Sequence, residues 1–153
     1  MDILYTARAT ATGGRDGAVR TDDGLLDLQL AYPTGLGGPG GKTNPEQLFA
    51  AGYAACFLNA VKRIAGERKV GIGKATATAE VGIGRLESSR FALDVSLIVE
   101  LPVTPADTAR TLIEGAHDIC PYSNATRGNL DVRISVKAAD DRAFDLHFAK
   151  AHP

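Results

Sequence analysis

The stretch Thr43–Val61, TNPEQLFAAGYAACFLNAV, decides the fold because it predicts a long, deeply buried helix. Asn44 is a favourable N-cap, and Pro45 suits the first helical position because its missing N–H would be unpaired there. Glu46 then places a negative charge at the positive end of the helix dipole. Thr43 with Glu46 also fits a capping box, so the pattern leaves two candidate cap residues. With either cap, a helix begins here.

The body of this helix, predicted over residues 45–66, is apolar on almost every side. Its apolar positions are Leu48, Phe49, Ala50, Ala51, Tyr53, Ala54, Ala55, Phe57, Leu58, Ala60, Val61 and Ile64. A helix of this kind is buried on most sides rather than lying on a surface. One sheet face cannot cover it, so either a single chain wraps around it or two chains share it. We favour two chains.

The composition sets limits on the class of protein. With 153 residues, 44% apolar and 23% charged, the chain is most simply one globular domain. A net charge of −1 gives no general attraction to nucleic acid or to an anionic membrane. No apolar run reaches the ~18 residues of a membrane span, and residues 1–4 lack the layout of a signal peptide. We therefore expect a cytoplasmic protein without nucleic-acid or membrane partners.

Alternating apolar and polar residues predict strands on both sides of the helix. We expect strands over residues 3–12, 18–20, 26–30, 75–83, 91–101 and 130–137, with a hairpin at 84–89. Thr104 and Pro105 start a second helix, which Pro121 prevents from continuing. The first three strands suggest an antiparallel meander. The order of strands, helix, strands, helix and strand is an α+β pattern.

We expect a single domain over residues 1–153. It comprises the strand meander over 1–34, a glycine-rich loop over 35–43, and the central helix with the remaining body over 44–140. The glycine-rich segment would be flexible as a linker and could place the first strands apart from the body, even on a partner chain. The simpler interpretation is a surface loop. The tail to Pro153 is polar, and we assign it no catalytic residue.

The chain has two cysteines, Cys56 and Cys120, which lie 64 positions apart. Disulfides are rare in a reducing compartment, where a pair of cysteines is more often catalytic or metal-binding. Free cysteines also often serve only as packing residues. A reactive thiolate needs a nearby cation, and Arg15, in a glycine-rich turn, is a candidate source. Glu46 could hold that arginine in a bidentate pair.

The positions of Glu46 and Cys56 limit how one site could use both. Ten residues separate them, which is about 15 Å along a helix with a rise of ~1.5 Å per residue. They cannot meet within one straight helix. If both serve one site, Glu46 must therefore come from a second chain whose central helix packs antiparallel to the first.

Three other chemistries compete at this point. Cys56, His117 and Cys120 could bind zinc, although a closed structural site needs a fourth ligand. Cys56 with His117 could form a cysteine hydrolase, although two cysteines fit redox chemistry better. The chain could also be a binding protein whose cysteines only pack.

Three segments carry a resemblance to a known family. They are Ala11–Gly17, ATGGRDG; Asn44–Phe57, NPEQLFAAGYAACF; and Ala116–Asn129, AHDICPYSNATRGN. The chain resembles the organic hydroperoxide resistance proteins, the Ohr branch of the OsmC/Ohr family. The two cysteine motifs are long and specific, and the segments span most of the chain in the right order. The tail beyond about residue 136 lies outside the match.

The resemblance implies a thiol-dependent peroxidase that reduces organic hydroperoxides to alcohols, with no metal or bound cofactor. Cys56 is then the peroxidatic cysteine and Cys120 the resolving cysteine. Arg15 and Glu46 match the residues that activate the thiolate and orient the peroxide. Because Cys120 lies near the negative end of its helix dipole, we predict that Cys56 is the more acidic thiol. His117 is expected to be structural.

The resemblance also implies the assembly and the reductant. The expected fold is an intertwined homodimer whose antiparallel sheets wrap two central helices, with the sites at the interface. The expected reductant is a dihydrolipoyl dithiol, carried on a lipoylated protein or free as dihydrolipoamide. Two alternatives stay open: an OsmC-branch peroxidase with another substrate preference, and a non-enzymatic module that binds hydrophobic ligands.

Overall fold

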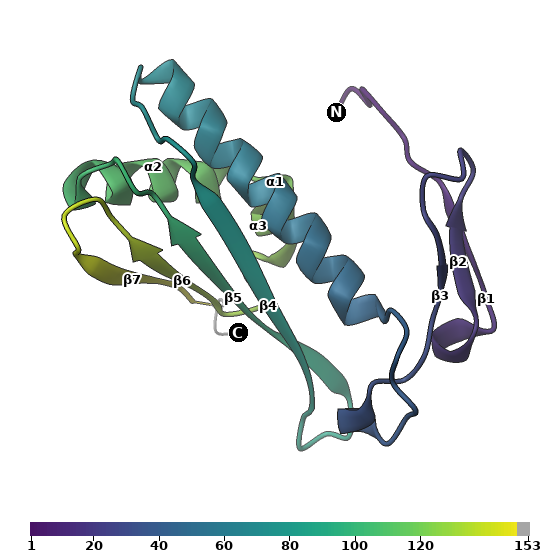
Figure 1. Ribbon diagram of the computed structural model, residues 1–153. Coiled ribbons are helices and arrows are strands. Elements are labelled where there is room, and N and C mark those ends of the chain that lie inside the picture. Colours follow the sequence, from purple (N-terminus) through teal and green to yellow (C-terminus); the bar gives the residue numbers. More distant parts are fainter. Residues whose placement is uncertain (150–153) are drawn as a thin grey trace. The chain divides into compact units, whose positions relative to one another are not determined.

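The computed structural model describes residues 1–149, and the chain divides into two compact units, residues 1–48 and residues 49–153. Each unit has its own sheet, in the order drawn in Figure 1. The long helix α1 (Pro45–Glu67) starts at the end of the first unit and continues through the second. Of the polar tail expected from the sequence, residues 150–153 lie outside the described residues.

The first unit is a three-stranded antiparallel meander, as predicted. Its strands are β1 (Ala9–Thr12), β2 (Ala18–Thr21) and β3 (Asp27–Gln29), in the order β1-β2-β3. The 3-10 turn η1 (Gly14–Asp16) joins β1 to β2. The first strand is shorter than the predicted 3–12, because residues 3–8 pair with no strand in the described chain.

The glycine-rich segment is a folded loop within the first unit. It contains the 3-10 turn η2 (Thr34–Leu36), and four of its backbone N–H groups are bonded: Leu36 and Gly38 donate to Pro33, Gly37 to Thr34 and Gly40 to Tyr32. Residue 38 must be glycine, since a Cβ there would lie 2.2 Å from Cβ of Tyr32. This stretch therefore has an ordered local structure.

A reciprocal cap starts α1 and decides between the two predicted cap residues. Oδ1 of Asn44 accepts a hydrogen bond from the backbone N–H of Gln47 at 2.9 Å, and Oε1 of Gln47 accepts one from the N–H of Asn44 at 3.3 Å. This is a capping box, with Asn44 and Gln47 in the two roles. Glu46 takes no part in the cap, so its carboxylate is free for another partner.

The second unit contains a four-stranded mixed sheet. Its strands are β4 (Thr76–Arg85), β5 (Phe91–Glu100), β6 (Val132–Lys137) and β7 (Ala143–Phe148), in the order β4-β5-β6-β7. The β4–β5 and β6–β7 pairs are antiparallel, whereas β5 and β6 are parallel. The prediction of antiparallel sheets did not include this parallel pair, whose crossover contains α2 (Ala106–Ile119) and α3 (Pro121–Thr126).

Two elements of this unit correct the sequence analysis. The expected last strand, 130–137, is followed by β7, so the tail is not merely polar. Pro121 does end α2, but it also occupies the first position of α3, where a proline is tolerated. Cys120 therefore lies in a one-residue junction between two helices.

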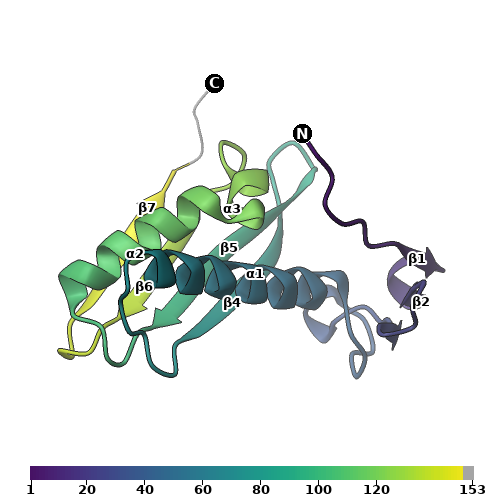
Figure 2. The ribbon, with the colours of Figure 1, turned by 90° about the horizontal axis from the view of Figure 1, so that it is seen from above.

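The core of the second unit lies between the sheet and its helices. Figures 1 and 2 show α1 and α2 side by side on one face of the sheet. Alternate residues of β5 and β6 face this layer because side chains alternate across a strand. The largest fully buried side chains are Tyr53, Phe57, Val61, Val95, Leu97, Val99, Leu101, Leu112, Ile113, His117, Val132 and Ile134. This layer fixes α1 and α2, which carry the two cysteine motifs.

One expectation about membranes needs correction. Within residues 1–149, α1 is long and apolar enough to cross a membrane by length and composition, with a mean hydropathy of 1.2 in its best window. The core helix of a folded domain passes the same test. Tyr53, Phe57 and Val61 of α1 are fully buried by the chain itself, and 33% of the apolar window is buried in all.

Candidate functional site

In the first unit, a tight glycine turn presents Arg15. Gly13 and Gly14 have φ of +74° and +61°, in the left-handed region that glycine adopts without strain. A Cβ at Gly17 would lie 1.7 Å from the backbone oxygen of Thr12, so the turn closes only with glycine there. The sequence motif GGRDG is thus explained by the turn, with Arg15 at its centre.

Arg15 and Glu46 form a bidentate ion pair across 31 positions of sequence. Nη1 and Nη2 of Arg15 donate to Oε2 and Oε1 of Glu46 at 2.8 and 2.6 Å. The side chains are 28% and 11% exposed, so water screens the pair only in part. The hydrogen bonds from Arg15 lower the pKa of Glu46, and those to Glu46 raise the pKa of Arg15. Both groups therefore stay charged at neutral pH, and the predicted pairing is confirmed.

In the second unit, the two cysteines lie next to each other. Cys56 is on α1, Cys120 is at the junction of α2 and α3, and their Sγ atoms are 3.7 Å apart. Both are free thiols, with Cys120 fully buried and Cys56 partly exposed. Two thiols at this distance can form a disulfide after a small movement, since an S–S bond is about 2.0 Å long.

The surroundings of Cys56 act on its acidity in opposite directions. Burial raises the pKa of Cys56, the backbone N–H of Tyr122 lowers it, and the neighbouring Cys120 raises it again. The overall shift is upward. None of these causes is a positive charge.

Three aromatic rings belong to the same hydrophobic cluster as the thiol pair. Tyr53 stacks on Tyr122 with ring centroids 5.6 Å apart, and Phe49 meets both rings edge-on. Gly52 leaves room for Tyr122, because a Cβ there would lie 2.6 Å from the Tyr122 hydroxyl. The thiols are therefore bordered by apolar surface, which favours contact with hydrocarbon groups over contact with water.

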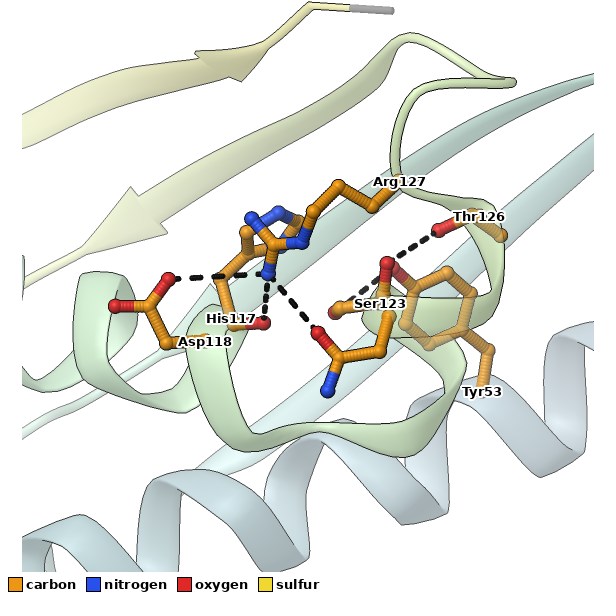
Figure 3. A network of polar contacts seen from close by, with 7 residues as sticks. Tyr53, His117, Asp118, Ser123, Thr126 and Arg127 are labelled. Atoms are coloured by element: carbon orange, nitrogen blue, oxygen red, sulfur yellow. Dashed lines mark hydrogen bonds and ion pairs between the residues drawn. The ribbon is translucent and has the colours of Figure 1, made fainter.

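His117 is a buried side chain that packs against β7. Its ring is buried and stacks on Phe148 with centroids 3.7 Å apart, and burial lowers its pKa to about 4. Nδ1 has no hydrogen-bond partner among residues 1–149. Arg127, seen beside it in Figure 3, donates to the backbone oxygen of His117 at 3.0 Å. His117 is thus a neutral, structural side chain.

This position of His117 removes the geometric basis of two competing chemistries. In the described chain, no three His, Cys, Asp or Glu side chains are gathered closely enough to hold a metal ion. No hydrogen bond joins His117 to Cys56 among the bonds of residues 1–149, so the pair expected of a cysteine hydrolase is not assembled. A hollow of about 280 Å³ lies beside His117, Arg127 and Phe148, and neither cysteine lines it.

The structure brings the four predicted residues together as two pairs. Arg15 lies with Glu46 in the first unit, and Cys56 lies with Cys120 in the second. The sequence analysis assigned no role to Ser123 or Arg127, which join the elements around Cys120. The polar run after Cys120 was the available signal, since buried polar side chains need partners.

The structure defines an α+β protein with a pair of adjacent free thiols. Comparison with known proteins gives its family. The family model for OsmC-like proteins matches residues 38–135, which include both cysteines. The chain therefore belongs to the OsmC/Ohr family.

Three relatives place it among the organic hydroperoxide resistance proteins. The organic hydroperoxide resistance protein of Xanthomonas axonopodis pv. citri is 48% identical, over 88% of this chain and 95% of its own length. The crystal structure of the organic hydroperoxide resistance protein OsmC of Legionella pneumophila is 49% identical, with a TM-score of 0.85, covering 88% and 98% of the two chains. That of OhrB of Bacillus subtilis is 42% identical, with a TM-score of 0.81, covering 88% and 100%. The family predicted from the sequence is confirmed.

Proposed function

We propose that this protein is a thiol-dependent peroxidase that reduces organic hydroperoxides to alcohols, as a response to oxidative stress. The observation that carries the proposal is the 3.7 Å separation of the Cys56 and Cys120 sulfur atoms. The names of the relatives support the hydroperoxide as substrate, and the aromatic border of the thiols supports an organic substrate over hydrogen peroxide.

The proposed cycle begins at Cys56, the partly exposed thiol. Its thiolate attacks the terminal oxygen of the hydroperoxide, the O–O bond breaks, and the departing alkoxide takes a proton to become an alcohol. The sulfenic acid on Cys56 then reacts with the Cys120 thiol. The S–O bond breaks, an S–S bond forms and water leaves. This second step protects Cys56 from irreversible oxidation.

Arg15 and Glu46 supply the positive charge in this proposal. A cation near Cys56 stabilises the thiolate and the charge that develops on the departing oxygen. Such a cation would oppose the effect of burial, which raises the pKa of Cys56. Glu46 holds the guanidinium in one orientation by its two hydrogen bonds.

A homodimer follows if all four residues serve one site. Glu46 and Cys56 are ten positions apart on α1, about 15 Å at the rise of an α-helix. The ion pair would then come from the partner subunit. The uncovered side of α1 supports this assembly, since Ala51 and Ala55 are exposed in one chain and Leu58 is only partly buried. Burying this apolar stripe against a second copy would stabilise the dimer.

A dihydrolipoyl dithiol is the proposed reductant, either as dihydrolipoamide or on a lipoylated protein, with no other cofactor. The family resemblance supports this choice. The burial of the sulfurs indicates the point of attack: Cys120 is fully buried, so an incoming thiolate would reach the disulfide at Cys56 and release Cys120. A cytoplasmic location is part of the proposal, because free cysteines persist in reducing compartments.

Steady-state kinetics tests the function directly. Reduction of cumene hydroperoxide and of hydrogen peroxide would be followed with dihydrolipoamide for the wild type, Cys56→Ser and Cys120→Ser. We expect fast turnover of the organic peroxide, slow turnover of hydrogen peroxide, and loss of both in Cys56→Ser. Activity that survives in Cys56→Ser would mean a different nucleophile. A wild type inactive with every dithiol would favour the ligand-binding module.

Mixed dimers test which chain supplies each residue. A Cys56→Ser chain retains the ion pair and lacks the nucleophile, and a Glu46→Ala chain has the opposite defect. If one site takes residues from both chains, the mixture should recover activity that neither variant has alone. Absence of any recovery, with dimer exchange shown by mass spectrometry, would count against the shared site.

Alkylation across a range of pH tests the order of thiol acidity. In the Cys120→Ser and Cys56→Ser variants only one thiol remains, and we expect the pKa of Cys56 to be the lower of the two. Arg15→Ala in the Cys120→Ser background should slow alkylation at neutral pH, because the thiolate loses its stabilising charge. A lower pKa at Cys120 would reverse the assignment of the two cysteines.

A further inference from the structure

Three buried hydroxyl groups connect α1 to α3 beside the cysteine pair. Oη of Tyr53 lies 3.0 Å from Oγ of Ser123, and the hydroxyl of Thr126 also hydrogen-bonds to Tyr53, as Figure 3 shows. Tyr53 and Ser123 are completely buried, and Thr126 is 5% exposed. In the chain as described, this is a polar contact between two helices in an otherwise apolar layer.

Each hydroxyl of this network has a partner. Thr126 donates its hydroxyl proton to the backbone oxygens of Tyr122 and Ser123, both at 3.1 Å. Either hydroxyl can donate across the Tyr53–Ser123 contact, because each has one proton and can also accept. Burial raises the pKa of Tyr53, which keeps its proton in place.

The Tyr53–Ser123 hydrogen bond lies close to the two sulfur atoms along the chain. Tyr53 precedes Cys56 by three positions on α1, and Ser123 follows Cys120 by three positions at the start of α3. Residues three apart share one side of a helix. The Tyr53–Ser123 hydrogen bond therefore spans the same two elements as the sulfur pair, one helical turn away.

Formation of a disulfide depends on how these elements are held. The sulfur atoms must approach from 3.7 Å to about 2.0 Å. Cys120 is the N-cap of α3, so its position follows that of α3, and a helix of six residues is too short to be stable without tertiary contacts. A hydrogen bond that ties α3 to α1 thus limits how far Cys120 can move from Cys56.

We propose that Tyr53, through its hydrogen bond to Ser123, is a positioning residue that keeps Cys120 within reach of Cys56 and so sets the rate of disulfide formation. The proposal rests on the peroxidase cycle given above and concerns its second step. In that step Cys120–SH displaces the hydroxyl of Cys56–SOH, an S–S bond forms, and the thiol proton leaves in the water released. Tyr53 exchanges no proton in this step.

Replacement of Tyr53 by phenylalanine separates positioning from packing. The ring of Tyr53 stacks on Tyr122 and meets Phe49 and Phe57 edge-on, and phenylalanine retains these contacts. Only the hydroxyl is lost. Tyr5→Phe is the matched control, because it makes the same chemical change at an exposed position of the first unit.

Rapid-mixing kinetics with one equivalent of cumene hydroperoxide measures the two steps apart. In Tyr53→Phe and in Ser123→Ala we expect the attack on peroxide to stay within about twofold of wild type and disulfide formation to slow about fivefold to tenfold, as for one lost hydrogen bond. Sulfenic acid trapped by dimedone and over-oxidised Cys56 should both increase. The double variant should be no slower than either single variant, because both remove the same interaction.

Disulfide formation at the wild-type rate in both variants would overturn the proposal. An equal loss in both steps would also overturn it, because the hydroxyl would then support the fold alone. A measurement without peroxide keeps the inference separate from the proposed function. Oxidation by diamide and equilibration with glutathione should show a disulfide about fivefold to tenfold less favourable in Tyr53→Phe, whether or not the wild type reduces hydroperoxides. A disulfide equilibrium equal to that of the wild type in Tyr53→Phe would count against the positioning role of Tyr53.

Discussion

Two bidentate arginine–carboxylate pairs, one in each unit, have nearly the same geometry and different surroundings. Arg15 binds Glu46 at 2.8 and 2.6 Å, and Arg133 binds Asp94 at 2.9 and 2.7 Å. The first pair is 28% and 11% exposed, whereas the second, between β6 and β5, is 49% and 68% exposed. Two pairs with nearly the same geometry therefore differ in how far water screens them.

What differs is how the chain constructs each pair. Arg15 is held in a turn that closes only with glycine at residue 17, and Glu46 is at the start of a capped helix. The Arg133–Asp94 pair joins neighbouring strands that are already paired along their backbones. The Arg15–Glu46 pair thus depends on one specific turn and one helix start, whereas the Arg133–Asp94 pair follows from strand pairing.

The largest expected effect is on activity. Arg15→Ala should lower kcat/KM for cumene hydroperoxide about 100-fold or more, because a preorganised charge at the reacting oxygen is lost. Arg133→Ala should change it less than about twofold, since surface pairs contribute little. Steady-state kinetics of both variants at one pH makes the comparison.

Arg15→Lys sharpens the same comparison. Lysine keeps the charge without the planar fork, so it should recover only part of the activity. Equal losses in Arg15→Ala and Arg133→Ala would show that the two pairs do not differ in function, and the role proposed for Arg15 would then be wrong.

The two ion pairs should respond to low pH differently from a third group, His117. The hydrogen bonds from arginine lower the pKa of Glu46 and of Asp94, so both pairs persist until the pH falls below the usual carboxyl range. Burial lowers the pKa of His117 from 6.5 to about 4, so between these values the unfolded chain binds a proton that the folded chain does not. The free energy of unfolding should therefore decrease as the pH is lowered from 6.5 to about 4, by on the order of 3 kcal/mol in total.

Urea unfolding between pH 7 and pH 4 measures this slope. Glu46→Gln and Asp94→Asn should keep it, and His117→Phe should remove it. If His117→Phe does not fold, NMR titration of the His117 ring in the wild type gives the answer instead. A ring that titrates near pH 6.5 would contradict the prediction.

The smallest expected effect is on stability at neutral pH. Double-mutant cycles should give a coupling of about 2 kcal/mol for Arg15–Glu46, as for hydrogen bonds between charged groups. They should give at most about 1 kcal/mol for Arg133–Asp94, which is exposed. Repeating the cycles in 1 M salt should weaken the exposed pair more. The reverse order would show that exposure does not govern the strength of these pairs.

The sequence predicted the elements whose patterns are local. The α1 helix, the meander and the β4–β5 hairpin follow from caps, turns and alternation, and the Arg15–Glu46 pairing also followed from the residues. The choice of cap was not decidable, because Thr43 with Glu46 and Asn44 with Gln47 fit the same spacing. The structure shows that Asn44 and Gln47 form the cap, which leaves Glu46 to bind Arg15.

The elements that were missed depend on what surrounds them. Pro121 signals both the end of one helix and the first residue of the next, so α3 was not distinguishable from a loop. In β7, Phe144, Leu146 and Phe148 do alternate with polar residues, and this signal was overlooked in a tail that is mostly polar. Residues 3–8 favour a strand by composition, but a strand needs a partner for its backbone groups.

The aromatic border of the thiols also gives the molecule an internal optical probe. The chain contains no tryptophan and four tyrosines, so its ultraviolet fluorescence comes from tyrosine alone. Two of these, Tyr53 and Tyr122, are stacked beside the cysteine pair. A disulfide quenches a tyrosine next to it, so oxidation of Cys56 and Cys120 should dim the emission and reduction should restore it. Oxidation and reduction of the cysteine pair could then be followed in the unlabelled protein as a decrease and a recovery of tyrosine fluorescence.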